Sequence, residues 1–215
     1  PPPAGPSSLT VLLDAPAGAP LIAGNRIEVE LDNAKARRWL LESIGRARHR
    51  VHLQIYMALD DDAGSAVEAA LAEAGRGGVT VRVLVDSLHG LHGSAGMRNP
   101  LLERLGNRPG VELRVIDPIT SAPSLHDLKR RDHRKATVID GDVALLGGRN
   151  LSHEYYTGFD EVRLTNQSQW REVPWLDAGA RVEGPAVAAI DRCFLEAWTA
   201  AGGAPFDIEE QQAAG

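Results

Sequence analysis

Strand and helix patterns alternate along residues 27–116 of this 215-residue chain, and this order restricts the fold more than any other feature of the sequence. Valine occupies every second position from Val79 to Val85, which is the pattern of a buried strand. We expect strands at 27–31, 51–57, 79–86 and 111–116, separated by helices at 33–48, 63–75 and 100–105. Strands joined through helices pair in parallel by right-handed crossovers. The sequence therefore predicts an α/β fold, a layered α-β-α sandwich with a mixed, largely parallel central sheet.

Composition restricts the class of protein further. The single cysteine, Cys193, excludes an internal disulfide, and the net charge of −6 argues against a general nucleic-acid coat. No apolar run approaches the roughly 18 residues of a membrane-spanning helix. We expect a proline-rich tail or linker at 1–20, one folded unit at 21–201, and a linker or boundary at 202–215.

The segment 132–150 reads DHRKATVIDGDVALLGGRN and differs in kind from its surroundings. Asp140-Gly141 between two β-rich runs predicts a two-residue hairpin turn, in which Ile139 pairs with Asp142. The register then implies three facing pairs, Lys135 with Leu146, His133 with Gly148, and Arg131 with Asn150. In this register His133, Lys135, Gly148 and Asn150 share one face of the hairpin. Asp140 lies on the opposite face, and we expect it to be structural.

These residue types indicate chemistry on a phosphate. Lys135 supplies a positive charge, Asn150 an amide donor, and His133 a nucleophile or proton shuttle near neutral pH. Such a set suits phosphoryl transfer by positioning and charge stabilisation. The run 126–135 adds five cationic residues against two acidic ones, a basic patch that we expect to attract anions.

The spacing His133-x-Lys135, four residues, Asp140, six residues and Gly147-Gly148-x-Asn150 resembles the signature of the phospholipase D superfamily. The segments 77–86 and 177–187 are similar to the cardiolipin-synthase-like branch of that superfamily. The resemblance implies that residues 21–201 form a catalytic half-domain, the N-terminal half of a two-half enzyme. In that family, two halves share one active site. One histidine forms a covalent phosphohistidine and the other protonates the leaving alcohol, and most members need neither metal nor other cofactor.

The resemblance also implies roles for individual residues. His133 would be the nucleophile, Lys135 and Asn150 would hold the phosphate, and Asp177 would orient His133 from behind, as in a catalytic triad. Further candidates for substrate binding are Gly147, Gly148, Arg131 and, in the loop after the strand 79–86, His89.

This chain contains one copy of the His-x-Lys motif, so a complete site needs a second half or a homodimer mate. The opening at Pro1 and the linker-like end favour an excised N-terminal half. Phospholipid is the expected substrate, with a peripheral membrane contact at Trp170 and Trp175 as one interpretation and ordinary packing as the other.

We expect phosphatidyl transfer or phospholipase D-type hydrolysis of phospholipid head groups. A nuclease of the same superfamily is the alternative, and the acidic net charge counts against it. A non-catalytic scaffold is the third, against which the intact set of motif residues weighs. The head group, the acceptor alcohol and the choice between cytoplasm and periplasm are left open by the sequence.

Overall fold

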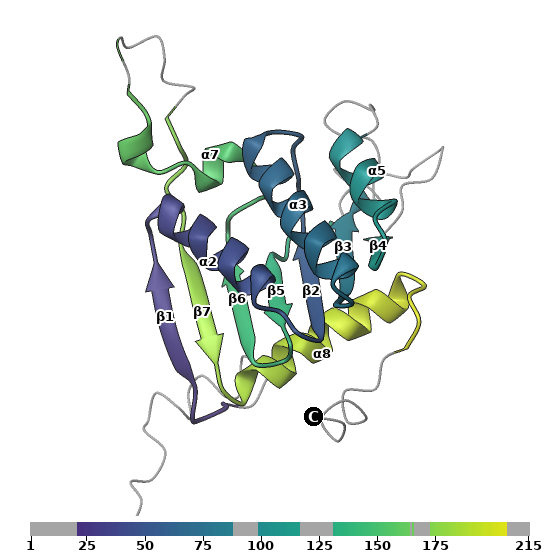
Figure 1. The fold of residues 1–215 in the computed structure, drawn as a ribbon. Coiled ribbons are helices and arrows are strands. Elements are labelled where there is room, and N and C mark those ends of the chain that lie inside the picture. Colours follow the sequence, from purple (N-terminus) through teal and green to yellow (C-terminus); the bar gives the residue numbers. More distant parts are fainter. Residues whose placement is uncertain (1–20, 88–98, 117–130, 164, 166–172, 206–215) are drawn as a thin grey trace, which may run out of the picture.

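The computed structural model describes residues 21–87, 99–116, 131–163, 165 and 173–205 of the chain (Figure 1). The elements follow the order predicted for the first half of the chain, and most of their ends lie within three residues of the prediction. The strands are β1 (Arg26–Glu30), β2 (Arg50–Ile55), β3 (Thr80–Asp86), β4 (Val111–Ile116), β5 (Ala136–Ile139), β6 (Val143–Gly147) and β7 (Gly179–Glu183). The helices are α2 (Asn33–Gly45), α3 (Asp62–Arg76), α5 (Pro100–Gly106), α7 (His153–Tyr156) and α8 (Ala186–Ala200), with a 3-10 turn at Phe159–Glu161.

The described strands form one sheet in the order β1-β7-β6-β5-β2-β3-β4. The pairs β2–β3 and β3–β4 are parallel, as expected for strands joined by helical crossovers. The pairs β2–β5, β5–β6, β6–β7 and β7–β1 are antiparallel, so β5 and β7 run against the other strands. The predicted mixed sheet in a layered α/β fold is confirmed. Most of its strands run in the same direction, although most neighbouring pairs are antiparallel.

The helix starts are set by side chains that accept hydrogen bonds from the first helical turn. Asp32 accepts from Lys35 N at 2.6 Å, Asp61 from Gly64 N at 2.9 Å, and Asn99 from Leu102 N at 3.3 Å. These are the short acceptor side chains favoured at helix N-termini. Helices α2, α3 and α5 lie on the same face of the sheet (Figure 1).

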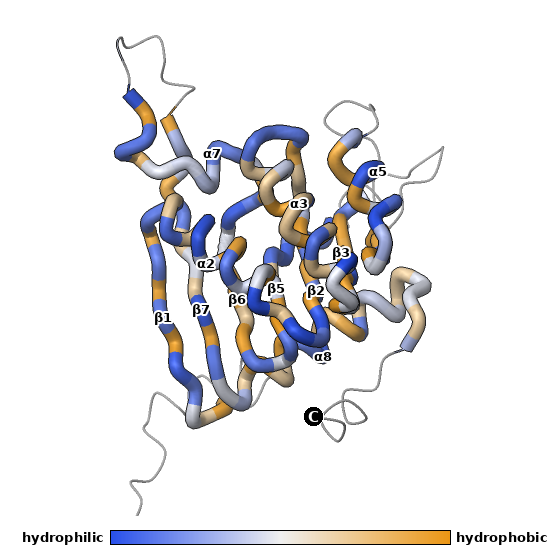
Figure 2. The backbone as a smooth tube through the Cα atoms, in the orientation of Figure 1, coloured by the Kyte–Doolittle hydropathy of each residue, from blue (hydrophilic) through white to orange (hydrophobic). Residues whose placement is uncertain are grey.

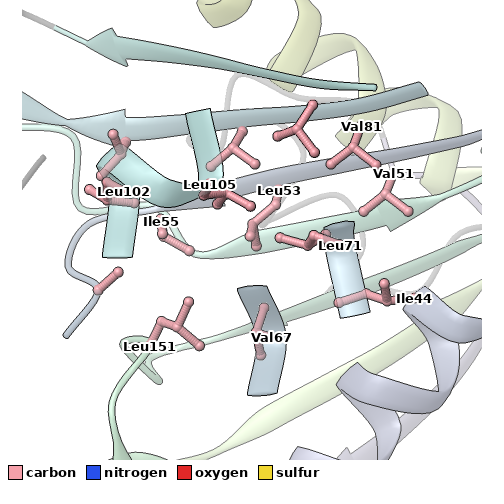
Figure 3. Packing of buried hydrophobic residues seen from close by; sticks show 14 of the residues in the cluster. Ile44, Val51, Leu53, Ile55, Val67, Leu71, Val81, Leu102, Leu105 and Leu151 are labelled. Carbon is pink, nitrogen blue, oxygen red and sulfur yellow. The ribbon is translucent and has the colours of Figure 1, made fainter. Parts of the chain in front are cut away.

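The main core lies between these helices and the sheet (Figure 3). Ile44 of α2 and Leu71 of α3 are fully buried, and they join Val51 and Leu53 of β2 and Val81 of β3 in one apolar cluster. Residues at alternate positions of β2 and β3 supply this face, as their strand period requires.

Helix α8 covers the opposite face of the sheet. Its apolar residues Phe194 and Trp198 pack against Leu84, and Val187 packs against Val138. At the β1 edge, hydrophobic and hydrophilic residues alternate along the strand (Figure 2). There Ile27 and Val29 are 62% and 68% exposed.

Under α8 lies a buried polar group. The His52 ring is stacked on Phe194 with 4.6 Å between ring centroids, and its Nδ1 lies 2.6 Å from Asp191 Oδ1. Arg50 donates to the other carboxylate oxygen of Asp191 at 3.3 Å, and Arg82 lies 3.5 Å from His52 Nε2. Burial lowers the pKa of His52, so this histidine is neutral at pH 7.

The β5–β6 hairpin differs from its predicted register. Asp140 and Gly141 have φ angles of 54° and 80°, and Asp142 N donates to Ile139 O at 3.0 Å, so the predicted turn is present. The ladder, however, pairs Ile139 with Val143 and leaves Asp142 as an extra residue in a bulge. The register therefore slips by one residue, and the predicted pairs Lys135–Leu146, His133–Gly148 and Arg131–Asn150 are wrong.

The cause of the bulge lies in the tertiary structure. The Asp140 carboxylate accepts hydrogen bonds from the backbone N–H groups of Arg48, His49 and Arg50 at 2.8–2.9 Å. Asp140 N donates in turn to Arg50 O at 3.0 Å. These bonds hold the turn against the start of β2, which is about 90 residues away in the chain.

Candidate active site

The motif residues gather at one edge of the sheet, formed by the ends of its strands (Figure 1). Because the strands run in both directions, the first residues of some strands lie there beside the last residues of others. His133 and Lys135 precede β5, Asn150 follows β6, and Asp177 precedes β7. Because β5 and β7 run against β2 and β6, their first residues meet the last residues of those strands. The same edge receives the carboxyl end of β2, where Tyr56 lies.

His133 and Lys135 are in direct contact. Lys135 Nζ lies 3.1 Å from His133 Nδ1 and donates to His133 O at 2.9 Å. The Tyr56 ring packs on both, with its centroid 4.5 Å from the His133 ring and 5.0 Å from Lys135 Nζ. The His133 side chain is exposed, whereas Lys135 is 8% exposed. The site thus presents an accessible imidazole above a buried ammonium.

The buried position of Lys135 shapes its charge. Burial lowers the pKa of the ammonium, while the carboxylates of Asp177 and Asp132 act in the opposite direction. Neither carboxylate makes an ion pair with Lys135 in the described structure, and the positive charge is met by a carbonyl, an imidazole and an aromatic face. An incompletely compensated cation of this kind favours an anionic ligand.

Asn150 supplies a second polar group at this edge. The residue is 6% exposed, and its Oδ1 has no hydrogen-bond partner in the described part of the chain. Ser152 Oγ, which is also buried, shares this property. The segment between them is anchored to the end of β2 by Leu151 N donating to Met57 O at 2.9 Å. Buried polar atoms without partners are uncommon in folded proteins and often mark functional positions.

Asp177 lies against Gly148. A Cβ atom on Gly148 would stand 2.5–2.6 Å from the two Asp177 carboxylate oxygens, so only glycine fits there with the carboxylate in this position. Asp177 Oδ1 accepts from Ala178 N at 2.7 Å. Among the described residues no hydrogen bond joins Asp177 to His133, so the contact expected from the resemblance is not formed in this arrangement of the two side chains.

Arg149, between Gly148 and Asn150, ties together three segments behind the site. Its guanidinium donates to Asn33 Oδ1 at 3.2 Å and to Leu31 O at 3.1 Å, and also to Asp177 O. Asn33 extends this network through bonds to Thr157 O and Trp175 O at 3.1 and 2.8 Å. Burial lowers the pKa of Arg149. The network fixes the segment that carries Asp177 relative to the end of β6.

Arg131 is engaged at the end of β3. Its guanidinium donates to the buried Asp86 carboxylate at 3.2 Å and to Ser87 Oγ at 2.7 Å. Asp86 also accepts from Asp132 N at 2.8 Å, and Asp132 accepts from Gln54 Nε2 at 2.9 Å. These bonds anchor the segment that leads into His133, whereas binding of substrate by Arg131 stays a prediction.

The other predicted site residues fall in different places. Gly147 N donates to Lys135 O at 3.4 Å, so this glycine is beside the lysine. Asp140 lies at the far end of β5 from Lys135, with its carboxylate bonded to backbone N–H groups. His89, like Trp170, lies outside the described residues. Trp175 is 59% exposed and stacks against Tyr155 with 6.4 Å between centroids.

Three residues at the site did not emerge from the sequence: Tyr56, Asp86 and Arg149. Tyr56 and Asp86 both stand at the carboxyl ends of neighbouring parallel strands, where open α/β sheets place their ligands. That rule alone could have selected them. No local signal identifies Arg149, because its partners come from distant segments.

Solved structures share this arrangement of strands and helices. NucT from Helicobacter pylori aligns over 82% of this chain and 96% of its own with a TM-score of 0.57 at 13% identity. Phosphatidylserine synthase from Haemophilus influenzae aligns over 80% of this chain and 36% of its own with a TM-score of 0.61 at 17% identity. Nuc from Salmonella typhimurium, a phospholipase D family member, aligns with a TM-score of 0.53 at 17% identity, over 82% and 95% of the two chains. The fold is therefore that of phospholipase D-like proteins.

Sequence comparison gives the family. Residues 40–173 match the family model described as "Cardiolipin synthase, PLD-like domain", and the chain belongs to this family. Cardiolipin synthase 1 of Bacillus anthracis is 33% identical over 160 residues, which are 74% of this chain and 28% of that protein. The major cardiolipin synthase ClsA of Bacillus subtilis is 32% identical over 177 residues, 82% of this chain and 34% of that protein. The chain thus spans about a third of the length of these curated relatives.

Proposed function

We propose that this chain supplies one half of the active site of a phospholipase D-type enzyme that acts on phospholipid head groups by phosphatidyl transfer or hydrolysis. The observation that carries the proposal is the contact between an exposed imidazole, His133, and a buried ammonium, Lys135. Asn150 adds a buried amide to the same edge, and its N–H group can donate to a phosphate oxygen. Membership of the cardiolipin synthase family supports phospholipid as the substrate class.

In the proposed reaction a ring nitrogen of His133 attacks phosphorus, and an N–P bond forms as the bond to the leaving alcohol breaks. The Lys135 ammonium and the Asn150 amide hold the phosphate oxygens and stabilise the charge that develops on them. A proton donor from a second half protonates the leaving alkoxide. Water or an acceptor alcohol then attacks the phosphohistidine and gives its proton to the group of the second half that protonated the leaving alkoxide. The N–P bond breaks and His133 is freed.

The tautomer of His133 gives Asp177 a function in this reaction. A neutral imidazole carries one lone pair, so Nε2 is nucleophilic only when the proton is on Nδ1. In the structure Nδ1 faces Lys135 Nζ, which is itself a donor. For attack through Nε2, an acceptor must take a hydrogen bond from Nδ1–H, and the resemblance implies that the Asp177 carboxylate has this role. We infer that Asp177 orients His133 in the reactive arrangement.

The second half of the site is part of the proposal. The two-half arrangement implied by the resemblance needs a second histidine, and either a further segment of a longer protein or a second copy of this chain would supply it. The chain spans only about a third of the length of its curated relatives, which is consistent with further segments.

No helix in the described part of the chain has the length and hydropathy of a membrane span.

Turnover by the complete protein tests the proposal. We expect phosphatidylglycerol to be converted, and His133→Asn and Lys135→Met to reduce conversion by a factor on the order of 10³ or more. Asp142→Asn, on the exposed bulge of the hairpin, is the matched control and retains activity. Cleavage of single-stranded DNA without lipid turnover would indicate the nuclease alternative. Loss of neither activity in His133→Asn would overturn the catalytic assignment.

A further inference from the structure

A cavity lies between α2 and the sheet, directly behind the candidate active site, with a volume of about 60 Å³. Its inner wall is apolar and includes Leu53, Val67 and Leu151, whose positions are seen in Figure 3. Its roof is the side of α2 that carries Ala36 and Trp39. A space of this size holds about four water-sized groups or a short aliphatic chain.

Small residues line the cavity on both the sheet and α2. Gly147 of β6 pairs with Gly179 of β7, and Ala36 lies above them on α2. A Cβ atom on Gly147 would stand 2.7 Å from Ala178 O, and one on Gly179 would stand 2.9 Å from Arg149 Nη1. These close approaches leave no room for a larger residue at either position, so neither glycine places a side chain in the space under α2.

The charged residues that line the cavity point to the kind of ligand. Among the described lining residues these are Lys135 and Arg149, and both are cations. Lys135 lines the cavity, and its Nζ contacts His133. The cavity and the candidate active site therefore have this residue in common. An apolar cavity bordered by cations fits an amphiphile with an anionic head and an aliphatic chain.

We propose that this cavity binds the first carbons of an acyl chain of the phospholipid whose phosphate lies at His133 and Lys135. The inference rests on the proposed function for the position of the phosphate. It makes Ala36 a determinant of substrate specificity, because a larger side chain there would fill the space.

Binding of short-chain phosphatidic acids to the 215-residue chain tests the proposal without turnover. Each buried methylene strengthens binding about fourfold. We expect dihexanoylphosphatidic acid to bind at least about tenfold more tightly than glycerol 3-phosphate, which lacks acyl chains. Affinity should rise with chain length and reach a plateau after about four to six carbons, when the cavity is full. A continuous rise without a plateau would indicate adsorption to an open surface and would overturn the proposal.

Substitution of Ala36 gives the second test. Ala36→Leu should weaken binding of dihexanoylphosphatidic acid at least about tenfold and leave glycerol 3-phosphate unaffected. The same substitution on the exposed face of α3, Ala69→Leu, is the matched control and should change neither affinity. Unchanged binding of the dihexanoyl ligand by folded Ala36→Leu would contradict the proposal, and the chain-length series decides the matter if that variant does not fold.

Three further outcomes are informative, and the last two separate this inference from the proposed function. Hexanoate that binds as tightly as the dihexanoyl ligand would identify a fatty-acid site and overturn the assignment to phospholipid. Lipid turnover by the complete protein without a chain-length plateau in binding would refute the cavity alone. The plateau without any turnover would refute the proposed function alone.

Discussion

The ring of Tyr56 lies 4.5 Å from the ring of His133, at a tilt of 56° between their planes, and the same ring faces Lys135 Nζ at 5.0 Å. One aromatic side chain at the end of β2 therefore contacts both motif residues at the start of β5. A cation over an aromatic face gains electrostatic stabilisation that partly offsets its burial. We interpret Tyr56 as a positioning residue for the pair.

Tyr56→Phe and Tyr56→Leu separate the ring from the hydroxyl. The phenylalanine variant keeps the face toward Lys135 and should retain most of the activity. The leucine variant loses this face, and we expect kcat/KM to fall by about 2- to 30-fold. The alkaline limb of its pH–rate profile should also move to lower pH, because the ammonium loses a stabilising contact. Equal kinetics and equal pH profiles in the two variants would refute the assignment.

Gly148→Ala tests the position of Asp177. The new methyl group would stand 2.5–2.6 Å from the Asp177 carboxylate oxygens and must displace them. We expect the rate to fall by at least about tenfold, because the substitution displaces the carboxylate that we infer to orient the nucleophile His133. Gly45→Ala at the end of α2 meets nothing within 4 Å and is the control. It should stabilise the fold by about 0.5–1 kcal/mol in thermal or urea unfolding and leave the rate unchanged.

The pH–rate profile depends on Lys135. Burial lowers the pKa of this ammonium from the ordinary lysine value of 10.5. Phosphate binding needs the protonated form, so activity is present below the lowered pKa and is lost as the pH rises through it. The profile should show an alkaline limb that lies below pH 10.5. Lys135→Arg carries a charge that does not titrate in this range. Any activity that remains in it should lack the alkaline limb, and persistence of the limb would assign it to another group.

Asp140→Asn tests the hairpin anchor. The carboxylate accepts three backbone hydrogen bonds from residues 48–50, and a single amide oxygen cannot accept all of them in the same geometry. Asparagine tolerates the positive φ of this position, so the turn itself is preserved. We expect the free energy of unfolding to fall by about 1–3 kcal/mol. A variant with wild-type stability but greatly reduced kcat would instead place Asp140 in catalysis.

The buried His52 makes stability depend on pH. Its pKa is lowered by burial from the ordinary 6.5, against the opposite effect of Asp191, and Arg50 and Arg82 face the same ring. Below pH 6.5 the unfolded state binds a proton that the folded state does not. The free energy of unfolding should therefore decline as the pH falls through this range, by up to about 1.4 kcal/mol per pH unit. Urea unfolding at pH 7 and pH 5.5 measures this decline. His52→Gln should reduce it.

Local patterns predicted most of the secondary structure because the alternation of apolar residues and the capping residues act within a few positions. Asp32, Asp61 and Asn99 begin their helices with hydrogen bonds that span three residues. The hairpin register could not be predicted in the same way. The bulge at Asp142 accompanies bonds between Asp140 and residues 48–50, which are close only in the folded chain.

The candidate site likewise contains residues that the sequence identified and residues that only the structure revealed. His133, Lys135 and Asn150 were identified from their spacing in one short segment, and His133 and Lys135 are in contact two residues apart in the segment that precedes β5. Arg149 could not be assigned, because its partners come from distant segments, whereas Tyr56 could have been selected only by its position at the carboxyl end of a parallel strand.

The sequence alone determined the layered α/β fold and the kind of chemistry, since both depend on residue types repeated or spaced within short segments. The tertiary structure decided the register of the hairpin, the position of Asp177 over Gly148, the aromatic contact from Tyr56 and the cavity under α2. The physical reason is that each of these depends on side chains from strands that meet at one edge or face of the sheet, and their distances are set by packing over the whole fold.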